Sequence, residues 1–327
     1  MRGTSKIIRG LLLGMGLTLA GVQGAQAEIK VGVSDWPGWV AWYVAQEKGF
    51  FKKHGADVQL VWFPNYTDSI QALSSGRLDA NSQALSDSLA PFAKNLPLKV
   101  VLVNDNSAGN DAILAKPAIK SIKDLKGKTV ALEQYTLSHF LLLQALAKNG
   151  MNASDVRIVN MGAGDAAAAF MAGRVDAAAV WNPWVNRIQS SGKGHAIFTS
   201  RDIPGLIPDL LVAQQKSIAA HRQDYVGMIR AWFDAVQFIQ TQPQAAAKIM
   251  APKVKLPPEE YVKFLSGTRF FDAKLNQQAL SPGNTPISLY YSGPVISRFL
   301  ISQKLLQKVP DMKVHIDTSL YDAAVAK

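Results

Sequence analysis

An internal repeat is the strongest constraint on the fold of this chain. Three segments of the N-terminal part recur in the same order farther along, displaced by 98, 98 and 97 residues. The paired segments are 30–35 with 128–133, 56–61 with 154–159, and 75–80 with 172–177. Three matches in order, with one residue of slippage, indicate two copies of one structural unit rather than chance similarity.

Each copy alternates apolar, strand-like runs with helical segments. In both copies a helical segment lies between the first two strands, at 40–54 and 138–149, and is followed by Gly55 or Gly150. Glycine commonly follows the last turn of a helix. Strands that alternate with helices of this length form parallel sheets with right-handed crossovers. The sequence therefore predicts an α/β fold with two similar lobes, each a parallel-rich sheet flanked by helices.

Two apolar runs flank the second copy, at 111–116 and 209–214, and each is expected to cross between the lobes. This places lobe 1 at 28–115 plus 209–327 and lobe 2 at 116–208. Beyond residue 214 the apolar spacing predicts helices only, so this tail is expected to return and cover lobe 1. A ligand cleft is expected between the lobes, which the crossovers allow to bend about a hinge.

Residues 1–27 have the three parts of a secretory signal peptide. Three basic residues precede an apolar stretch at 11–22, and the small-residue segment 25–27 precedes Glu28. The apolar stretch is too short to span a bilayer, which needs about 20 residues. The sequence predicts cleavage before Glu28 and export.

Charge and cysteine content support the same location. The whole chain has a formal charge of +11, and removal of three basic residues with the signal peptide leaves 32 Lys and Arg against 24 Asp and Glu, or +8. The lysines are scattered along the sequence and form no cluster of five or six. This pattern and the predicted export argue against nucleic acid as a partner. Cysteine is absent, which excludes disulfides, a thiolate nucleophile and a lipid anchor on cysteine. We expect a soluble periplasmic protein.

Ligands of open parallel sheets bind beyond the carboxyl ends of the strands, so these ends carry the candidate binding residues. Five of the seven tryptophans lie there, and no Lys or Arg does, which argues against an anionic ligand. The acids Asp35 and Glu133 occupy equivalent strand ends of the two copies. The candidate ligand-binding residues are Asp35, Trp36, Trp39, Asn65, Tyr66, Ser82, Gln83, Asn110, Asp111, Glu133, Tyr135, Ser138, His139, Asp165, Trp181 and Asn182.

Motifs for catalysis and cofactors are weak. The segment 162–167 fits the pattern G-x-G-x-x-A, but the acid expected about 20 residues beyond it is missing. The five histidines form no zinc-binding pattern, and no G-x-S-x-G motif is present. We therefore expect no cofactor, no metal and no catalytic set. An enzyme acting on a pyrimidine or a small acid is the alternative of another class, with Asp35, Glu133 and His139 as its candidate bases.

Four segments carry a resemblance to a known family. They are 49–55 (GFFKKHG), 73–80 (LSSGRLDA), 111–116 (DAILAK) and 122–131 (IKDLKGKTVA). The chain resembles the periplasmic binding proteins of ABC importers for sulfonates, taurine, nitrate and thiamine-precursor pyrimidines. The resemblance implies a type II periplasmic binding protein fold, a small-molecule ligand, the permease subunits of an importer as partners, and a monomer.

Three further segments, 35–39, 110–113 and 198–206, are similar to receptors found with urea- and guanidine-carboxylating enzymes. That similarity implies import of a small nitrogen compound. Closure of the cleft is expected to bring Asp35 and Glu133 together beside Trp36 and Trp181, and a guanidine-like cation between them is favoured. Taurine, an alkanesulfonate or a nitrate-type anion, held by helix N-termini, is the alternative, and a neutral heterocycle is a third.

Overall fold

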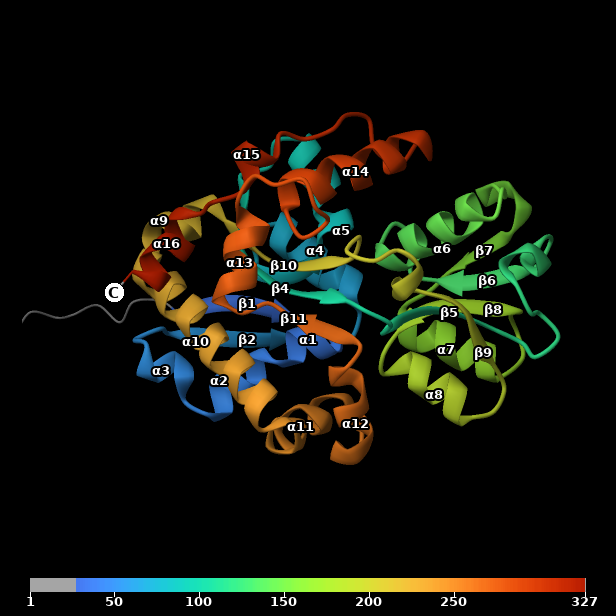
Figure 1. The fold of residues 1–327 in the computed structure, drawn as a ribbon, viewed down its shortest axis with the longest axis horizontal. Coiled ribbons are helices and arrows are strands. Elements are labelled where there is room, and N and C mark those ends of the chain that lie inside the picture. Colours follow the sequence, from blue (N-terminus) through green and yellow to red (C-terminus); the bar gives the residue numbers. More distant parts are fainter. Residues whose placement is uncertain (1–27, 327) are drawn as a thin grey trace, which may run out of the picture.

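The computed structural model describes residues 28–326, so the predicted signal peptide lies outside the described residues. The chain forms two sheets, each flanked by helices (Figure 1). The first sheet has the order β11-β4-β10-β3-β1-β2 and the second β7-β6-β8-β5-β9. We call the parts built on them the first and second lobes.

The strands of the first sheet are β1 (Ile29–Val33), β2 (Val58–Trp62), β3 (Ala80–Ala84), β4 (Leu98–Ser107), β10 (Pro208–Gln214) and β11 (Thr268–Phe270). Those of the second are β5 (Asp111–Ala115), β6 (Thr129–Leu132), β7 (Arg157–Asn160), β8 (Ala177–Trp181) and β9 (His195–Thr199). The helices around the strands of the second lobe are α6 (Leu137–Lys148), α7 (Ala163–Met171) and α8 (Trp184–Ser190), with the 3-10 turns η1 (Ile122–Leu125), η2 (Ala153–Asp155) and η3 (Ser200–Asp202).

The remaining helices precede β4 or follow β10 in the chain. Before β4 come α1 (Pro37–Val40), α2 (Trp42–Glu47), α3 (Phe50–Lys53), α4 (Tyr66–Ser74) and α5 (Leu85–Ala93). After β10 come α9 (Gln215–Ala220), α10 (Arg222–Thr241), α11 (Pro243–Met250), η4 (Ala251–Val254), α12 (Pro258–Leu265), α13 (Ala273–Leu280), α14 (Leu289–Ser302), α15 (Met312–His315) and α16 (Ser319–Val325). No helix within residues 28–326 is both long and apolar enough to span a bilayer.

The parallel strands predicted from the repeat are confirmed. β1 pairs in parallel with β2 and β3, and β6 pairs in parallel with β7 and β8. In each lobe the aspartate of the repeated Gly-Arg-x-Asp-Ala motif ties the third strand to the first. Asp79 accepts from the backbone N–H of Lys30 at 3.0 Å, and Asp176 accepts from that of Thr129 at 3.0 Å. This part of the repeat is therefore scaffold.

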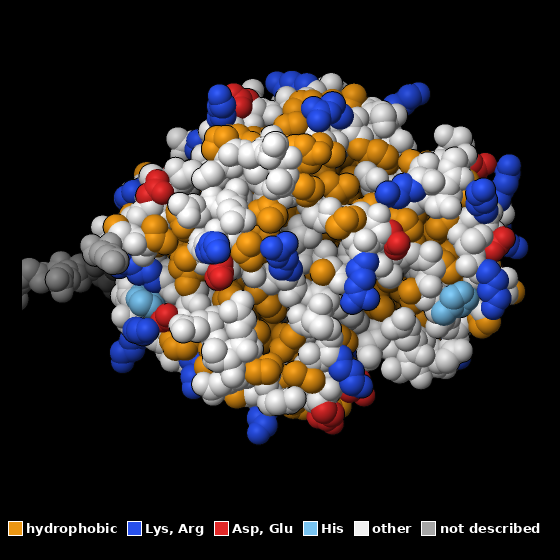
Figure 2. All heavy atoms as spheres, in the orientation of Figure 1, with side chains coloured by type: hydrophobic (Ala, Val, Ile, Leu, Met, Phe, Trp, Pro, Cys, Tyr) orange, Lys and Arg blue, Asp and Glu red, His pale blue; other side chains and the backbone are white. Residues whose placement is uncertain are grey.

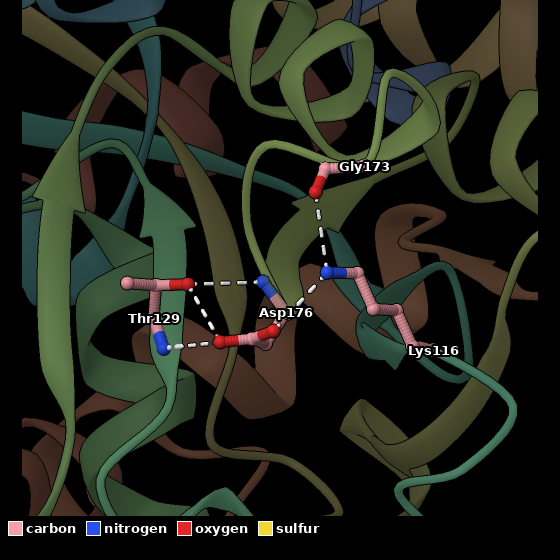
Figure 3. Close-up of polar contacts among 4 residues, drawn as sticks. All are labelled: Lys116, Thr129, Gly173 and Asp176. Carbon is pink, nitrogen blue, oxygen red and sulfur yellow. Dashed lines mark hydrogen bonds and ion pairs between the residues drawn. The ribbon is translucent and has the colours of Figure 1, made fainter.

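In the second lobe this tie is reinforced. Asp176 also accepts from the hydroxyl of Thr129 at 2.8 Å and from Nζ of Lys116 at 3.1 Å, and Lys116 reaches the carbonyl of Gly173 (Figure 3). The backbone hydrogen bond from Thr129 lowers the pKa of Asp176 to about 2, helped by the Thr129 hydroxyl and by Lys116, although burial acts in the opposite direction. Its carboxylate is thus held ionised as a structural anchor.

The strands that cross between the lobes differ from the expected boundaries. β5 pairs antiparallel with β8 and β9, so residues 111–115 belong to the second sheet, and the first crossover lies at 108–110. β10 pairs antiparallel with β3 and β4 in the first sheet. The two crossing strands are therefore equivalent members of the repeat, each inserted beside the third strand of the lobe that it enters. Apart from the aspartate near its start, each strand is a continuous apolar run that fits either sheet, so periodicity did not distinguish them.

The C-terminal tail returns to the first lobe, as expected. Helix α10 packs against α2, α3 and α16, and the orange and red helices surround the first sheet in Figure 1. The prediction of helices only is wrong at one point, because β11 adds an antiparallel edge strand to β4. Three residues are too few to produce a recognisable strand period. Lys and Arg side chains are dispersed over the face drawn in Figure 2, in keeping with the scattered charge of the sequence.

Candidate functional site

Asp35 joins the two lobes. It follows β1 of the first lobe, and its carboxylate accepts from Nε1 of Trp181 at 2.7 Å and from Nε1 of Trp184 at 2.8 Å, both in the second lobe. Burial raises its pKa to about 6, although the two indole hydrogen bonds act in the opposite direction, and the nearby Glu133 raises it further. This acid is thus an acceptor for donors across the lobe boundary.

Glu133 repeats the arrangement from the other side. It follows β6 of the second lobe and accepts from the backbone N–H of Thr67 in the first lobe at 2.8 Å, and from the Thr67 hydroxyl. Its second oxygen, Oε2, is buried without a hydrogen-bond partner. Burial raises its pKa, and the Thr67 hydrogen bonds partly offset that effect. Each acid of the repeat-related pair is therefore bonded to the opposite lobe, rather than free to face its equivalent across an empty cleft.

Four more acids lie buried behind this pair. Asp105 on β4 stands directly opposite Asp209 on β10 in the antiparallel register, and their carboxyl groups are within hydrogen-bonding reach of one another. Asp111 begins β5 and is the repeat equivalent of Asp209. Asp87 on α5 accepts from the hydroxyl of Tyr66 at 2.8 Å. Each of the four influences the pKa of at least one other, so they form one connected group.

These carboxyl groups lack compensating positive charge. Asp105, Asp111 and Asp209 are at most 1% exposed, and no Lys, Arg or His in residues 28–326 forms an ion pair with any of the six acids. Burial raises the pKa of Asp87 and of Asp111 to about 7 and raises those of Asp105 and Asp209 as well. An isolated buried carboxylate is strongly disfavoured, so such a group stays neutral unless a cation joins it.

Asp111 is the least satisfied of these acids. Both of its carboxyl oxygens are buried and neither receives a hydrogen bond. The hydroxyl of Ser107, which lies 2.7 Å from Oγ of Ser200, is near enough to lower the pKa of Asp111 but forms no hydrogen bond with it. A buried polar group without a partner costs about 1–3 kcal/mol, which a bound donor would recover.

Aromatic rings lie among the acids. Trp36 donates to Oδ1 of Asp105 at 3.0 Å and packs edge-on against Trp39, with ring centroids 6.5 Å apart. Tyr66 lies between Trp39 at 4.9 Å and Trp181 at 5.9 Å, again measured between centroids. Each of Trp36, Tyr66 and Trp181 is thus bonded to a buried carboxyl group and packed against another ring. Aromatic faces and ionised carboxylates are both groups that attract cations.

Two cavities adjoin this buried group. One, of about 220 Å³, is lined by Asp87, Tyr135 and His139 together with apolar residues of α5, α6 and α14. Burial lowers the pKa of His139 to about 4, so its ring there is neutral. The other, of about 210 Å³, brings Asp35 and Trp184 together with three cations. Those cations are Arg187, Lys253 and Lys255.

These basic residues qualify the expectation of a cleft without Lys or Arg. The strand ends indeed lack them, but α8 and η4 bring them to the rim beside Asp35. The Arg187 guanidinium stacks on the Trp184 ring at 4.5 Å and donates to the carbonyl of Val254 at 3.1 Å, so it too links the lobes. No group of three His, Asp or Glu side chains suited to a metal ion occurs in the described part of the chain.

The structure divides the sequence-predicted site residues into three groups. Those that meet in the buried interlobe group are Asp35, Trp36, Trp39, Tyr66, Asp111, Glu133 and Trp181. Asn110 and Asn182 bond to one another at 2.9 Å beside the first crossover. The others lie outside that group. Ser82 accepts from Trp42 in the core of the first lobe, Gln83 bonds within β3 and α5, and Ser138 is buried in α6. His139 lines a cavity, and the side chains of Asn65, Tyr135 and Asp165 are exposed.

Sequence reasoning missed Asp87, Asp105 and Asp209 as site residues, and it left Thr67 and Trp184 out of the candidate list although both follow strand ends. A signal was present for two of them, because Asp105 and Asp209 are acids at the ends of long apolar runs. An ionisable group in a strand buried on both faces is uncommon and is a recognised marker of function.

Comparisons with known proteins agree with this picture. The family model described as NMT1/THI5 like matches residues 36–246. A putative binding protein of Brucella abortus is 30% identical over 235 residues, which cover 70% of this chain and 72% of that protein. The taurine-binding periplasmic protein of Escherichia coli is 31% identical over 151 residues, or 46% of this chain and 47% of its own length.

Solved structures share the architecture. The alkanesulfonate-binding protein SsuA of Xanthomonas axonopodis pv. citri, bound to MOPS, superposes with a TM-score of 0.76 at 20% identity and covers 89% of this chain and 98% of its own. This similarity confirms the predicted two-lobe periplasmic binding protein fold. Since the matched model spans well over half of the sequence, the chain belongs to the NMT1/THI5-like family of proteins.

Proposed function

We propose that this protein is an exported receptor that binds a small nitrogen-containing cation, guanidine-like in chemistry, and delivers it to the permease subunits of an ABC importer. The observation that carries the proposal is the Asp111 carboxyl group, buried with both oxygens unpartnered at the centre of a group of acids that lacks a counter-charge. Export through a signal peptide at residues 1–27 and action as a monomer are parts of the same proposal.

A planar guanidinium suits these residues for two reasons. It donates hydrogen bonds in a fork that matches a carboxylate, and its face stacks on aromatic rings. At about 4 Å and an effective dielectric constant near 20, each contact between a cation and a carboxylate is worth roughly 4 kcal/mol before the cost of desolvation. Stacking on a tryptophan such as Trp36 or Trp181 adds about 1–2 kcal/mol.

The second candidate is a receptor for taurine, an alkanesulfonate or a similar anion. It is favoured by the rim cavity, where Arg187, Lys253 and Lys255 lie beside Trp62 and Trp184. The names of two relatives, a taurine-binding and an alkanesulfonate-binding protein, point to the same ligand class. The cation would bind at Asp111 and the anion beside Arg187, so substitutions at these two residues distinguish the two candidate functions.

A receptor is preferred to an enzyme because the candidate bases are already engaged or neutral. Asp35 and Glu133 accept hydrogen bonds across the lobe boundary, and His139 has a lowered pKa in a buried position.

Titration calorimetry of the mature protein with guanidinium chloride, taurine and ethanesulfonate tests the proposal. We expect guanidinium to bind stoichiometrically and to be recovered unchanged. Asp111→Asn should weaken that binding by about tenfold or more, because a hydrogen bond to a charged group contributes about 1.5–3 kcal/mol. Glu47→Gln, which changes an exposed acid of α2, is the control and should leave the affinity unchanged.

The anion receptor would be identified by the opposite pattern. Taurine or ethanesulfonate would then bind tightly, Arg187→Met would abolish that binding, and Asp111→Asn would leave it unchanged or improve it. Consumption of any of the three compounds by the purified protein would instead indicate an enzyme.

A further inference from the structure

A third cavity, which we call the hinge cavity, lies on the face of the first sheet away from the interlobe acids. Its volume is about 220 Å³, and both segments that cross between the lobes, 108–110 and 200–207, contribute to its wall. Asn106 of β4 pairs with Arg269 of β11 in the antiparallel register, so these two side chains point to one face of the sheet and Asp105 points to the other. The hinge cavity is therefore separate from the buried interlobe group.

Two guanidinium groups give the hinge cavity a positive charge. Arg201 comes from η3 of the second lobe and Arg269 from β11 of the first, and neither forms an ion pair with an acid of residues 28–326. Among the described residues, no Asp or Glu lines the cavity. Two cations without a neighbouring acid favour a negatively charged occupant.

Arg201 is held in position by the first crossover. Its Nε donates to the carbonyl of Ala108 at 2.9 Å. A Cβ added at Gly109 would lie 2.7 Å from Cζ of Arg201, so a residue without a side chain is needed for the guanidinium to pack on this backbone. The terminal nitrogens of Arg201 form no hydrogen bond within the described residues. They are available to bind a carboxylate as a fork.

Asn106 supplies a donor of a second kind. Its side chain lines the hinge cavity and is only 7% exposed, yet its amide forms no hydrogen bond within residues 28–326. A buried amide ordinarily has a partner, because a hydrogen bond must replace the water that it has lost. The unpartnered amide therefore points to an occupant that carries a hydrogen-bonding group.

The remaining wall of the hinge cavity is apolar. It includes Phe271, Pro286 and Ile287, and the Arg269 guanidinium lies over the Phe271 ring at 5.9 Å. Gly205 has a φ of +79°, and a Cβ there would lie 2.5 Å from Cβ of Pro286, so the second crossover packs closely on the segment before α14. An inorganic ion would leave this apolar wall in contact with water, whereas an organic anion covers it.

We propose that the hinge cavity binds a small organic carboxylate with a flat apolar body. Its carboxylate lies between Arg201 and Arg269 and accepts from the Asn106 amide, and its body packs on the Phe271 ring. Because the two arginines belong to different lobes, the bound anion links the lobes behind the hinge. The site is distinct from that of the transported ligand, so the inference does not depend on whether that ligand is a cation or an anion.

Titration calorimetry of the mature protein with sodium benzoate, benzamide and inorganic phosphate tests this site. We expect benzoate to bind stoichiometrically, and benzamide, which has the same ring without the charge, to bind about tenfold or more weakly. Arg269→Met should weaken benzoate binding by about tenfold or more, because it removes a charged hydrogen bond. Arg298→Met, which changes an exposed arginine of α14, is the matched control and should bind benzoate as the wild type does.

Arg187→Met distinguishes the hinge cavity from the rim cavity and should leave benzoate binding unchanged. Loss of binding in this variant together with its retention in Arg269→Met would place the anion at the rim and overturn the inference. Failure of the folded wild type to bind benzoate, or tighter binding of phosphate than of benzoate, would also overturn it. Since these titrations contain no guanidinium, their failure leaves the proposed function intact.

Crystals grown with para-bromobenzoate give a measurement that does not depend on any variant. Anomalous scattering should place the bromine beside Phe271 and Ile287, with the carboxylate towards Arg201. A hinge cavity without bromine, at a concentration that saturates the protein in solution, would overturn the inference.

Discussion

Identical side chains take opposite roles in this protein because their surroundings differ. Asp176 receives backbone, hydroxyl and ammonium hydrogen bonds, and its pKa falls to about 2. Asp111 is buried without such donors, and its pKa rises to about 7. Donors stabilise the charged form of the first acid, whereas desolvation penalises the charged form of the second. At the residue scale, Asp176 therefore stabilises the fold, whereas Asp111 destabilises it.

The destabilising effect of Asp111 predicts the sign of a change in the free energy of unfolding. An acid whose pKa is higher in the folded than in the unfolded state destabilises the fold increasingly as pH rises from the unfolded pKa, about 3.9, towards the folded value. Asp111→Asn should therefore raise the free energy of unfolding of the empty receptor at neutral pH by about 2 kcal/mol, and this gain should shrink towards acidic pH.

Chemical denaturation of the wild type and Asp111→Asn at several pH values measures this effect. Glu47→Gln serves as the exposed control and should change the free energy of unfolding little. If Asp111→Asn were destabilising at neutral pH, the buried acid would instead be part of a satisfied structural network. A variant that is more stable yet binds less ligand is the expected signature of a binding residue.

The short element after β1 shows how a local sequence builds the floor of the site. Pro37 occupies the first turn of α1, where its fixed φ and missing N–H are tolerated. Trp36 on one side of it bonds to Asp105, and Gly38 on the other lets the helix backbone approach that carboxyl group. Tyr261 of α12 then fixes the element from the C-terminal tail. At the element scale, the segment 35–39 therefore supplies Asp35, which accepts hydrogen bonds from the second lobe, and it also packs against the buried Asp105 beside Asp209.

Gly38→Ala is the change that tests this element. The added Cβ would lie 1.8 Å from Oδ2 of Asp105 and 2.6 Å from Nε1 of Trp36, so the buried pair must shift. We expect a loss of about 2 kcal/mol in the free energy of unfolding, as is typical of overpacking, together with weaker binding of guanidinium.

The control for this variant is Gly127→Ala. Nothing lies within 4 Å of a Cβ at that position, but φ is +72°, so alanine is strained there without touching the site. This variant should lose stability and retain ligand affinity. An equal loss of affinity in both variants, measured by calorimetry, would mean that Gly38→Ala acts through general destabilisation rather than through Asp105.

At the scale of the whole molecule, contacts between the lobes set the balance between open and closed forms. Asp35 accepts from Trp181 and Trp184, Thr67 donates to Glu133, and Asn182 bonds to Asn110 at the hinge. A ligand shifts this balance only by its difference in affinity for the two forms. Direct contacts between the lobes lower the free energy that the ligand must supply on closing.

Trp184→Phe should weaken closure, because it removes an indole donor to Asp35 while keeping an aromatic ring. In small-angle scattering we expect a larger radius of gyration for the empty variant than for the empty wild type, and contraction of both on addition of guanidinium. The apparent affinity for guanidinium should fall in proportion to the decrease in the fraction of closed form. Trp62→Phe, a matched change in the same rim cavity, is the control. Identical scattering with and without bound ligand in the wild type would refute hinge closure.

Much of the architecture was predictable because its determinants are local and repeated. Strand and helix periods, glycines after helices and the offset of 98 residues indicated two parallel α/β lobes and placed Asp35 and Glu133 at equivalent strand ends. The repeat also made Asp111 and Asp209 equivalent, since each is the first or second residue of a crossing strand. Equivalence in the sequence, however, does not state which sheet a strand enters.

Tertiary structure alone decided the composition of the site. The pairing of β4 with β10 brings together Asp105 and Asp209, which lie 104 positions apart, and α8 and η4 carry Arg187 and Lys253 to the rim. The bond between Trp181 and Asp35 spans 146 positions. Local patterns report which face of an element is apolar, but not which distant element covers it. The charge, burial and pKa of each acid depend on which distant element covers it, because desolvation and hydrogen bonding are set by neighbours in space and not by neighbours in the chain.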